Sequence, residues 1–275
     1  MNKLTNKDLN IIKTVLDKYE NSNYQNYKVE YFNEGTNSKV FLLNNKYIIK
    51  QNSEEIIKSE ILFSENNKHP LLQKLLFYDE NHKYIIYKYI EGINLNNFSN
   101  INIKLLIESL LDIVNSYKKT DIDFYGYINS PKKSWEEFLK EEISDCEYSY
   151  KSIKNFDIEK ECLIISKYKF EKKIIHGDFG AHNFLTKNNK LSGVIDPETI
   201  IGDSLYDILF AICSNPNILN YFCELNTIFK IINEPQEKII SLLKIILFSR
   251  ITRAYHHHKK DVDFYINFYI KAFKI

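Results

Sequence analysis

Residues 174–185 read IIHGDFGAHNFL, and residues 193–198 read GVIDPE. An apolar, strand-like pair precedes a loop that holds Asp178, and Asn183 follows five positions later. Apolar runs over 184–186 and 191–195, joined by polar residues 187–190, predict a hairpin. Because a hairpin returns the chain to its starting end, Asn183 at its entry and Asp196 at its exit are expected to lie together.

The order His-x-Asp-x-x-x-x-Asn, with an aspartate thirteen residues further on, has the spacing of a kinase catalytic loop and its metal-binding aspartate. Phosphoryl transfer needs a carboxylate that accepts the proton of the attacking hydroxyl, which we assign to Asp178. It also needs oxygen ligands for Mg²⁺, for which Asn183 and Asp196 are the candidates. The spacing therefore predicts a kinase that uses Mg²⁺ with ATP or GTP.

The first ninety residues predict a small antiparallel sheet. A helix capped by Thr5 precedes strands over 27–32, 39–43 and 46–50, and a helix from Ser53 precedes strands over 75–78 and 84–90. Beyond Gly92 the apolar spacing is mostly helical. We expect an α+β fold of two lobes, with a nucleotide-binding lobe over 1–90, a helical catalytic and substrate-binding lobe over 91–275, and a cleft between them.

A lysine at the end of a strand supplies the positive charge that such a cleft needs. Lys50 ends the run YIIK and is expected to reach phosphate oxygens of the nucleotide. Glu60 is the preferred partner for Lys50, because Ile57 and Ile61 flank it on the inward stripe of the next helix. The competing carboxylates are Glu54 and Glu65, and the helix dipole alone would explain Glu54.

Two further segments are candidates for nucleotide contact. The loop between the first two strands could cover the phosphates, although a single glycine is also typical of a plain hairpin turn. The segment 87–92 could be a hinge whose backbone, at Tyr89, binds a purine edge, or ordinary strand packing. The loop candidates are Gly35, Thr36, Asn37 and Ser38.

With these motifs the chain resembles the aminoglycoside phosphotransferase and choline kinase group, which has a protein-kinase-like fold. The resemblance rests on the HGD segment with Asn183, on IDPE at 195–198, on GDSLYD at 202–207 and on the lobe junction at 87–95. It implies that Asp178 is the catalytic base, that Asn183 and Asp196 hold metal, and that Asp207 braces the catalytic loop. It also implies a small-molecule hydroxyl acceptor.

Two features depart from the family pattern: the phosphate loop is poor in glycine, and the C-terminus is not acidic. Some aminoglycoside kinases hold a cationic sugar with acidic residues near the end of the chain. Here Glu198 and Asp203 would have to take that role.

Several of these residues also have simpler interpretations. His176 is expected to hold the loop through backbone hydrogen bonds, Asp207 could merely cap a helix, and Glu198 could be a solvated charge. Arg250 and Arg253, one turn apart, could line the cleft or pair with acidic neighbours. Trp135 could anchor its helix or stack on a substrate. The run at 256–258, three histidines, is expected to be a solvated helix end, since adjacent helical residues point about 100° apart.

The composition limits the class of protein. The chain has 275 residues, with 37 Lys and Arg against 36 Asp and Glu, so the basic excess of a duplex-DNA binder is absent. No apolar run would span a membrane or act as a secretory signal. The four cysteines are expected to be buried free thiols in a reducing cytoplasm.

We therefore expect a cytoplasmic small-molecule kinase whose leading acceptor is an aminoglycoside-type antibiotic. Choline, a sugar, a macrolide or a protein hydroxyl are alternative acceptors, and the oligomeric state is open. A non-catalytic nucleotide-binding scaffold is the rival class, and it is disfavoured because every polar position that the chemistry requires is filled. A helical interaction protein with an accidental motif match fails on the same ground.

Overall fold

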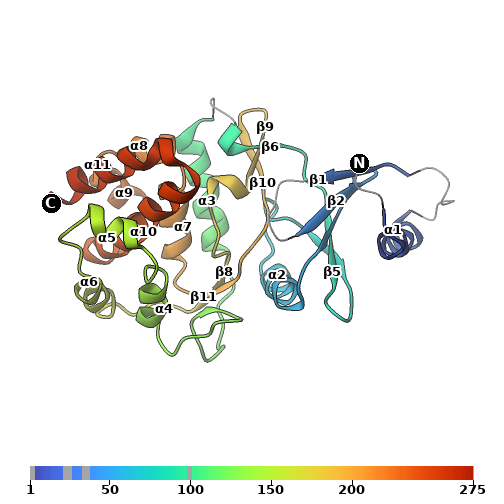
Figure 1. Cartoon of the computed structure of the whole chain (residues 1–275), viewed down its shortest axis with the longest axis horizontal. Helices are drawn as coiled ribbons and strands as arrows, with labels where there is room; N and C mark the ends of the chain where they lie inside the picture. The colour runs from blue at the N-terminus through green and yellow to red at the C-terminus, as the bar shows by residue number, and fades with distance from the viewer. Residues whose placement is uncertain (1–3, 21–26, 33–37, 98–100, 275) are drawn as a thin grey trace.

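The computed structural model describes residues 4–20, 27–32, 38–97 and 101–274. A sheet with two helices forms the N-terminal part, and helices form most of the C-terminal part (Figure 1). The predicted α+β class is confirmed. No helix in these ranges is long and apolar enough to cross a membrane.

The N-terminal sheet has five antiparallel strands in the order β1-β2-β3-β5-β4. The hairpin between β2 and β3 turns at Asn44 and Asn45, both at φ 54°, a left-handed conformation that asparagine tolerates. The predicted strand over 27–32 begins too early and the predicted strand over 84–90 ends too late, because residues 27–28 and 89–90 lie in loops. The strands are β1 (Val29–Phe32), β2 (Lys39–Leu43), β3 (Tyr47–Gln51), β4 (Leu75–Tyr78) and β5 (Tyr84–Lys88).

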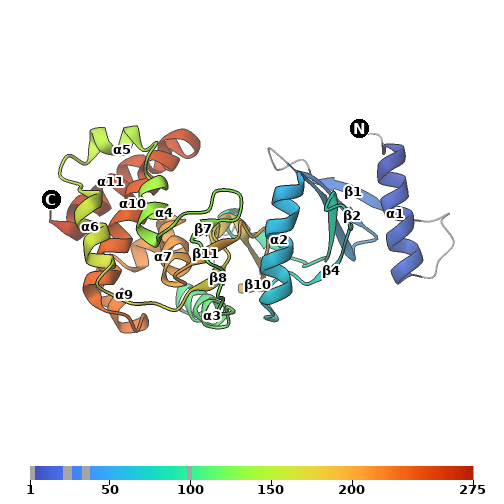
Figure 2. The same cartoon turned by 90° about the horizontal axis from the view of Figure 1, so that it is seen from below.

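One helix covers each face of this sheet (Figure 2). Helix α1 (Asn6–Tyr19) packs Ile12 and Val15 against Phe41, and α2 (Glu54–Asn66), with Ser53 at its N-cap, packs Ile57 against the other face. A sheet with apolar side chains on both faces needs this double cover.

The C-terminal part is built around α10 (Gln236–His257), whose buried residues contact several neighbouring helices. Its apolar residues are buried on several sides, as expected of a helix inside a bundle. The other helices are α3 (Ile103–Asn115), α4 (Trp135–Glu141), α5 (Glu147–Ser152), α6 (Ile158–Ile165), α7 (Leu205–Cys213), α8 (Pro216–Tyr221), α9 (Leu225–Ile231) and α11 (Val262–Phe273).

Two small sheets support the loop at 176–183. The predicted hairpin is present as β9 (Phe184–Lys187) and β10 (Lys190–Val194), and β6 (Ile93–Asn94) pairs with β9. The second sheet, β7 (Gly126–Tyr127), β11 (Ile200–Gly202) and β8 (Lys173–Ile175), was not fully foreseen, because two of its strands are too short to show a period.

The cysteines, the histidine run and Trp135 lie where the sequence predicted them, with one exception. Cys146, Cys162 and Cys213 are buried free thiols, but Cys223 is exposed, which corrects the expectation for that residue. The three histidines at 256–258 are exposed at the end of α10, and no group of His, Cys, Asp or Glu that could hold a metal ion exists among the described residues. Trp135 is buried, stacked on Phe138, and acts as a helix anchor.

The packing of Trp135 on Gly202 makes a testable prediction. A Cβ atom at Gly202 would lie 2.2 Å from the Trp135 ring, so Gly202→Ala should lower the free energy of unfolding by about 1–3 kcal/mol, measured by urea denaturation. In a Trp135→Phe background, which lacks the second ring, the same change should cost clearly less. Equal costs in both backgrounds would show that the clash is not the cause.

Candidate functional site

The loop at 176–183, which carries the candidate catalytic base Asp178, is fixed by Asp207. The backbone N–H groups of His176 and Gly177 donate to its two carboxylate oxygens at 2.8 and 3.0 Å. Asp207 lies in the first turn of α7 and is fully buried, and burial raises its pKa to about 7 although both donors favour the charged form. It therefore braces the loop.

Gly177 makes the sharp turn of this loop possible. Its φ is +80°, and a Cβ atom there would lie 2.0 Å from the carbonyl oxygen of Glu198. Only glycine fits such a left-handed turn against another backbone. The loop and the segment at 196–198 are thus held in contact.

His176 lies beneath the loop rather than in the cleft. Its ring is 1% exposed, and its Nε2 lies 3.0 Å from the carbonyl oxygen of Ile195. Burial lowers the pKa of His176 to about 4, so the ring is neutral and Nε2 is the donor. Its position matches a role in holding the chain just before Asp196.

Asp178 lies in the loop that Asp207, Gly177 and His176 hold in place. Its Oδ2 lies 2.8 Å from Nε2 of His182 and 2.9 Å from the donating amide nitrogen of Asn183. Burial opposes ionisation of Asp178, but the contact with His182 outweighs it and lowers the pKa. The carboxylate is therefore charged at neutral pH. No donor to Oδ1 is present in the described part of the chain.

Lys50 joins the sheet, helix α2 and the end of β10. Its Nζ lies 2.6 Å from Oε1 of Glu60 and also contacts Oδ1 of Asp196. Burial alone would lower the pKa of Lys50, yet the two carboxylates raise it, so the amine stays charged. The structure brings Lys50 to Glu60 as the sequence predicted.

The competing carboxylates lie elsewhere. Glu54 pairs with Lys58 on the surface, and Glu65 accepts from Tyr78. Glu60 is 1% exposed, and its second oxygen, Oε2, accepts from the hydroxyl of Tyr87 at 3.0 Å. Tyr87 thereby satisfies the oxygen of Glu60 that Lys50 does not contact. The sequence pattern did not suggest this hydrogen bond.

Asn183 and Asp196 supply oxygen donors at the two ends of the hairpin. The carboxylate of Asp196 is 53% exposed and stands on a backbone with φ +63°. Asn183 is buried at the hairpin entry, and its backbone carbonyl accepts from the N–H of Ile195 at 3.1 Å. One amide and one half-exposed carboxylate suit Mg²⁺, which usually takes one or two protein oxygens and keeps several waters.

Some of these groups open into one cavity of about 380 Å³, which Asn183 does not line. It lies between α2 and the C-terminal part and contains several of the predicted residues together: Ser38, Lys50, Glu60, Asp178, Asp196 and Glu198. Burial raises the pKa of Glu198, and the charges of Asp178 and Asp196 in the same cavity raise it further. The cavity thus has a cation at one wall and carboxylates at another.

One predicted contact, that of Asp203, is corrected by the geometry. Asp203 is 4% exposed, forms an ion pair with Lys238 at 2.8 Å and accepts from the N–H of Leu205, so its charge is used inside the fold and cannot hold an acceptor. The N–H of Tyr89 donates to the carbonyl of Lys46 at 2.8 Å, so a contact with a purine edge would use the Tyr89 carbonyl, and it stays a prediction.

The predicted phosphate loop is only partly described. Ser38 lines the cavity, and its hydroxyl accepts from the side chain of Asn52 at 2.5 Å. Gly35, Thr36 and Asn37 lie outside the described residues. Their expected contact with phosphate stays a prediction.

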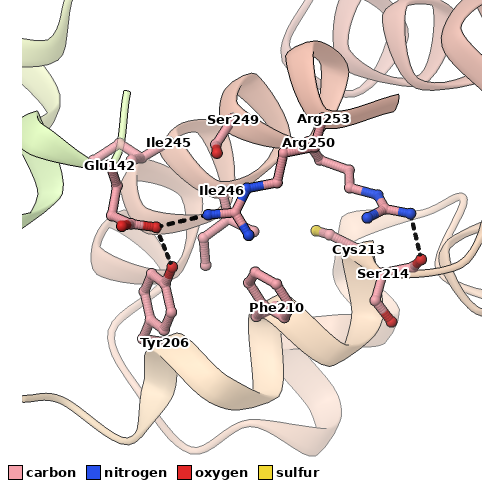
Figure 3. A pocket seen from close by; sticks show the side chains of 10 residues that line it. All are labelled: Glu142, Tyr206, Phe210, Cys213, Ser214, Ile245, Ile246, Ser249, Arg250 and Arg253. Atoms are coloured by element: carbon pink, nitrogen blue, oxygen red, sulfur yellow. Dashed lines mark hydrogen bonds and ion pairs between the residues drawn. The ribbon is translucent and has the colours of Figure 1, made fainter. Parts of the chain in front are cut away.

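A second group of residues, beside the cavity, was missed from the sequence. Glu142 accepts from the hydroxyl of Tyr206 at 2.9 Å and pairs with Arg253 at 3.0 Å (Figure 3). It also accepts from the hydroxyl of Tyr127 at 3.2 Å. Tyr127 also lines the main cavity, with Asn129. These residues come from distant segments of the sequence. Only Arg253 was marked by a pattern, its spacing of one helical turn from Arg250.

The buried imidazole of His176 gives a pH prediction. With a pKa near 4 when folded and near 6.5 when unfolded, His176 binds more protons in the unfolded state, so stability should fall as pH falls. Between pH 7 and 5 the wild type should lose about 2 kcal/mol more unfolding free energy than His176→Gln, measured by urea denaturation. Equal losses would mean that the ring titrates normally.

The comparisons with known proteins agree with this geometry. Residues 69–226 match the model of the phosphotransferase enzyme family, and no curated protein matches the chain. Aminoglycoside phosphotransferase APH(4)-Ia is a structural neighbour, with a TM-score of 0.61, 16% identity, and 94% of this chain and 96% of that chain covered.

Two further neighbours have similar values. The GDP complex of aminoglycoside 2'-phosphotransferase-IIIa has a TM-score of 0.54 at 16% identity and covers 98% of this chain and all of its own. ADP-bound APH(2'')-Ib has a TM-score of 0.53 at 18% identity, covering 94% and 97%. At these identities the neighbours establish the fold, and the family match covers more than half of the sequence. The chain therefore belongs to the phosphotransferase enzyme family.

Proposed function

We propose that this protein is a Mg²⁺-dependent kinase that transfers the γ-phosphoryl group of ATP or GTP to a hydroxyl of a small molecule. The observation that carries the proposal is the cavity in which Lys50, Asp178 and Asp196 meet. These are the groups that phosphoryl transfer requires. Residues 1–90 would bind the nucleotide, and residues 91–275 would supply the catalytic loop and the acceptor site.

Each residue has a role that follows from its position. Lys50, fixed by Glu60, would contact phosphate oxygens. Asn183 and Asp196 would hold Mg²⁺, which when bound neutralises phosphate charge. Asp178 would accept the proton of the acceptor hydroxyl at Oδ1, while His182 and Asn183 keep Oδ2 in place.

The residues of the site determine the class of acceptor less closely than they determine the reaction. The fold neighbours include ternary complexes of APH(4)-Ia variants with AMP-PNP and hygromycin B, so an aminoglycoside-type acceptor is the first class to assay. Glu198 remains the carboxylate at the cavity for contact with an acceptor. Choline, sugars and macrolides are the other acceptors to assay. The proposed location of the enzyme is the cytoplasm.

Removing the catalytic base should abolish turnover but not nucleotide binding. We expect Asp178→Asn to lower the rate of phosphoryl transfer by about 10²–10⁴, because the amide cannot accept the hydroxyl proton. The measurement is nucleotide turnover with each acceptor class, with binding of Mg²⁺-nucleotide by calorimetry as the second readout. The exposed Asp145→Asn is the matched control. Full activity in Asp178→Asn would exclude the assigned role.

The support that Tyr87 gives to Glu60 should appear in nucleotide kinetics. Glu60→Gln should raise KM for the nucleotide about tenfold, since Lys50 loses its charged partner, and Tyr87→Phe should raise it by less. Tyr78→Phe is the matched control, because it removes a similar hydrogen bond to Glu65 on the exposed side of α2. If Tyr78→Phe and Tyr87→Phe behave alike, Tyr87 does not position the ion pair.

A further inference from the structure

Helix α2 is tied to the C-terminal part by a buried threonine. The helix lies between the N-terminal sheet and the C-terminal part (Figure 2). The hydroxyl of Thr199 donates to the backbone carbonyl of Ser59, in the middle of α2, at 2.5 Å. The N–H of Thr199 donates to the hydroxyl of Ser59 at 3.2 Å. Thr199 is 0% exposed, so water does not compete for these two hydrogen bonds.

Each residue of this pair lies next to one part of the site. Ser59 precedes Glu60, the carboxylate that holds Lys50. Thr199 follows Glu198, whose N–H donates to a backbone carbonyl of the catalytic loop at 2.9 Å. The two hydrogen bonds therefore connect the lysine ion pair to the catalytic loop by a short path of directly bonded residues.

The ion pair at the same boundary is less suited to hold a fixed distance. Lys50 contacts the carboxylate of Asp196, but this carboxylate is 53% exposed and is also a candidate metal ligand. A metal ion would use the same oxygens that contact Lys50. The hydrogen bonds of Thr199 are buried and uncharged, and they involve no candidate metal ligand, so they can hold α2 in either case.

Helix α2 has a separate anchor at its C-terminal end. There the side chain of Asn67 donates to the backbone carbonyl of Ile174 at 2.9 Å. Loss of the Thr199 contact would therefore free the part of α2 that lines the cavity without detaching the whole helix. Variants at Thr199 are thus expected to fold.

We propose that Thr199 and Ser59 are positioning residues that set the distance between the Lys50–Glu60 pair and Asp178. This inference rests on the proposed kinase function, in which the lysine contacts the nucleotide and Asp178 the acceptor hydroxyl. A misplacement of about 1 Å can lower the rate of a reaction by about 10². Loss of the two hydrogen bonds should therefore lower kcat more than it weakens nucleotide binding.

Two substitutions at Thr199 separate positioning from stability. Thr199→Val keeps the shape of the side chain but removes the hydroxyl, and it should lower kcat about tenfold at saturating nucleotide and acceptor. Thr199→Ser keeps the hydroxyl but loses a methyl group, so its melting temperature should fall while kcat stays close to that of the wild type. Calorimetry with Mg²⁺ and AMP-PNP should give similar Kd values for all three proteins.

Ser149 provides a matched control inside the helical part. Its hydroxyl donates to the backbone carbonyl of Phe248 at 2.5 Å, and its N–H donates to the hydroxyl of Thr252 at 3.1 Å, the same two kinds of bond onto a helix. None of these three residues lines the cavity. Ser149→Ala should lower the melting temperature about as much as Thr199→Val, by about 2–4 °C, and leave kcat unchanged. Equal kcat in these two variants would contradict the proposal.

A distance measurement tests the contact without any turnover. Spin labels on Lys58→Cys, at an exposed position of α2, and on the exposed native Cys223 report the distance between α2 and the helical part. The other three cysteines are buried. By electron paramagnetic resonance, the distance distribution should be broader in Thr199→Val than in the wild type or in Ser149→Ala. Identical distributions in all three would overturn the proposal.

The two readouts separate this inference from the proposed function. A wild type that phosphorylates no acceptor contradicts the kinase, and the distance distribution alone then decides whether Thr199 positions α2. Turnover by the wild type, with kcat and the distance distribution both unchanged in Thr199→Val, supports the kinase and contradicts the positioning role.

Discussion

The contact of Lys50 with Glu60 and Asp196 is the interaction on which the site depends. It joins strand β3 and helix α2 of the N-terminal part to the segment after β10. A buried lysine is stable only when carboxylates neutralise it, so the three elements must meet wherever Lys50 is charged. Lys50, Glu60 and Asp196 also line the cavity, so this pairing forms part of its wall.

The catalytic loop is held by a second constraint. Its backbone N–H groups end on Asp207, and the turn at Gly177 permits no side chain. Backbone geometry places Asp178, and His182 and Asn183 hold its Oδ2, which leaves Oδ1 for chemistry. The loop and the lysine meet at the segment around Asp196, because His176 contacts the carbonyl of Ile195 and Lys50 contacts Asp196.

Local patterns predicted the parts of the site that lie near one another in sequence. The hairpin from Asn183 to Asp196 follows from strand lengths and a polar turn, and the pairing of Lys50 with Glu60 follows from one strand and the next helix. Asp203 was misassigned because its partner, Lys238, lies on a helix whose packing no local pattern shows. The phosphate loop has a single glycine, a pattern that a plain hairpin turn shares, so local sequence does not distinguish the two.

The acceptor side shows why specificity is harder to predict than chemistry. Phosphoryl transfer uses charged groups at fixed spacings, whereas recognition here depends on which charges remain after the fold has paired the rest. Glu142 looks available in sequence, but Tyr127, Tyr206 and Arg253 from three distant segments satisfy it. Arg250 is likewise engaged inside the fold, with the backbone carbonyl of Ser214 and the ring of Tyr265. A charge in a sequence therefore predicts a ligand only once its internal partners are known.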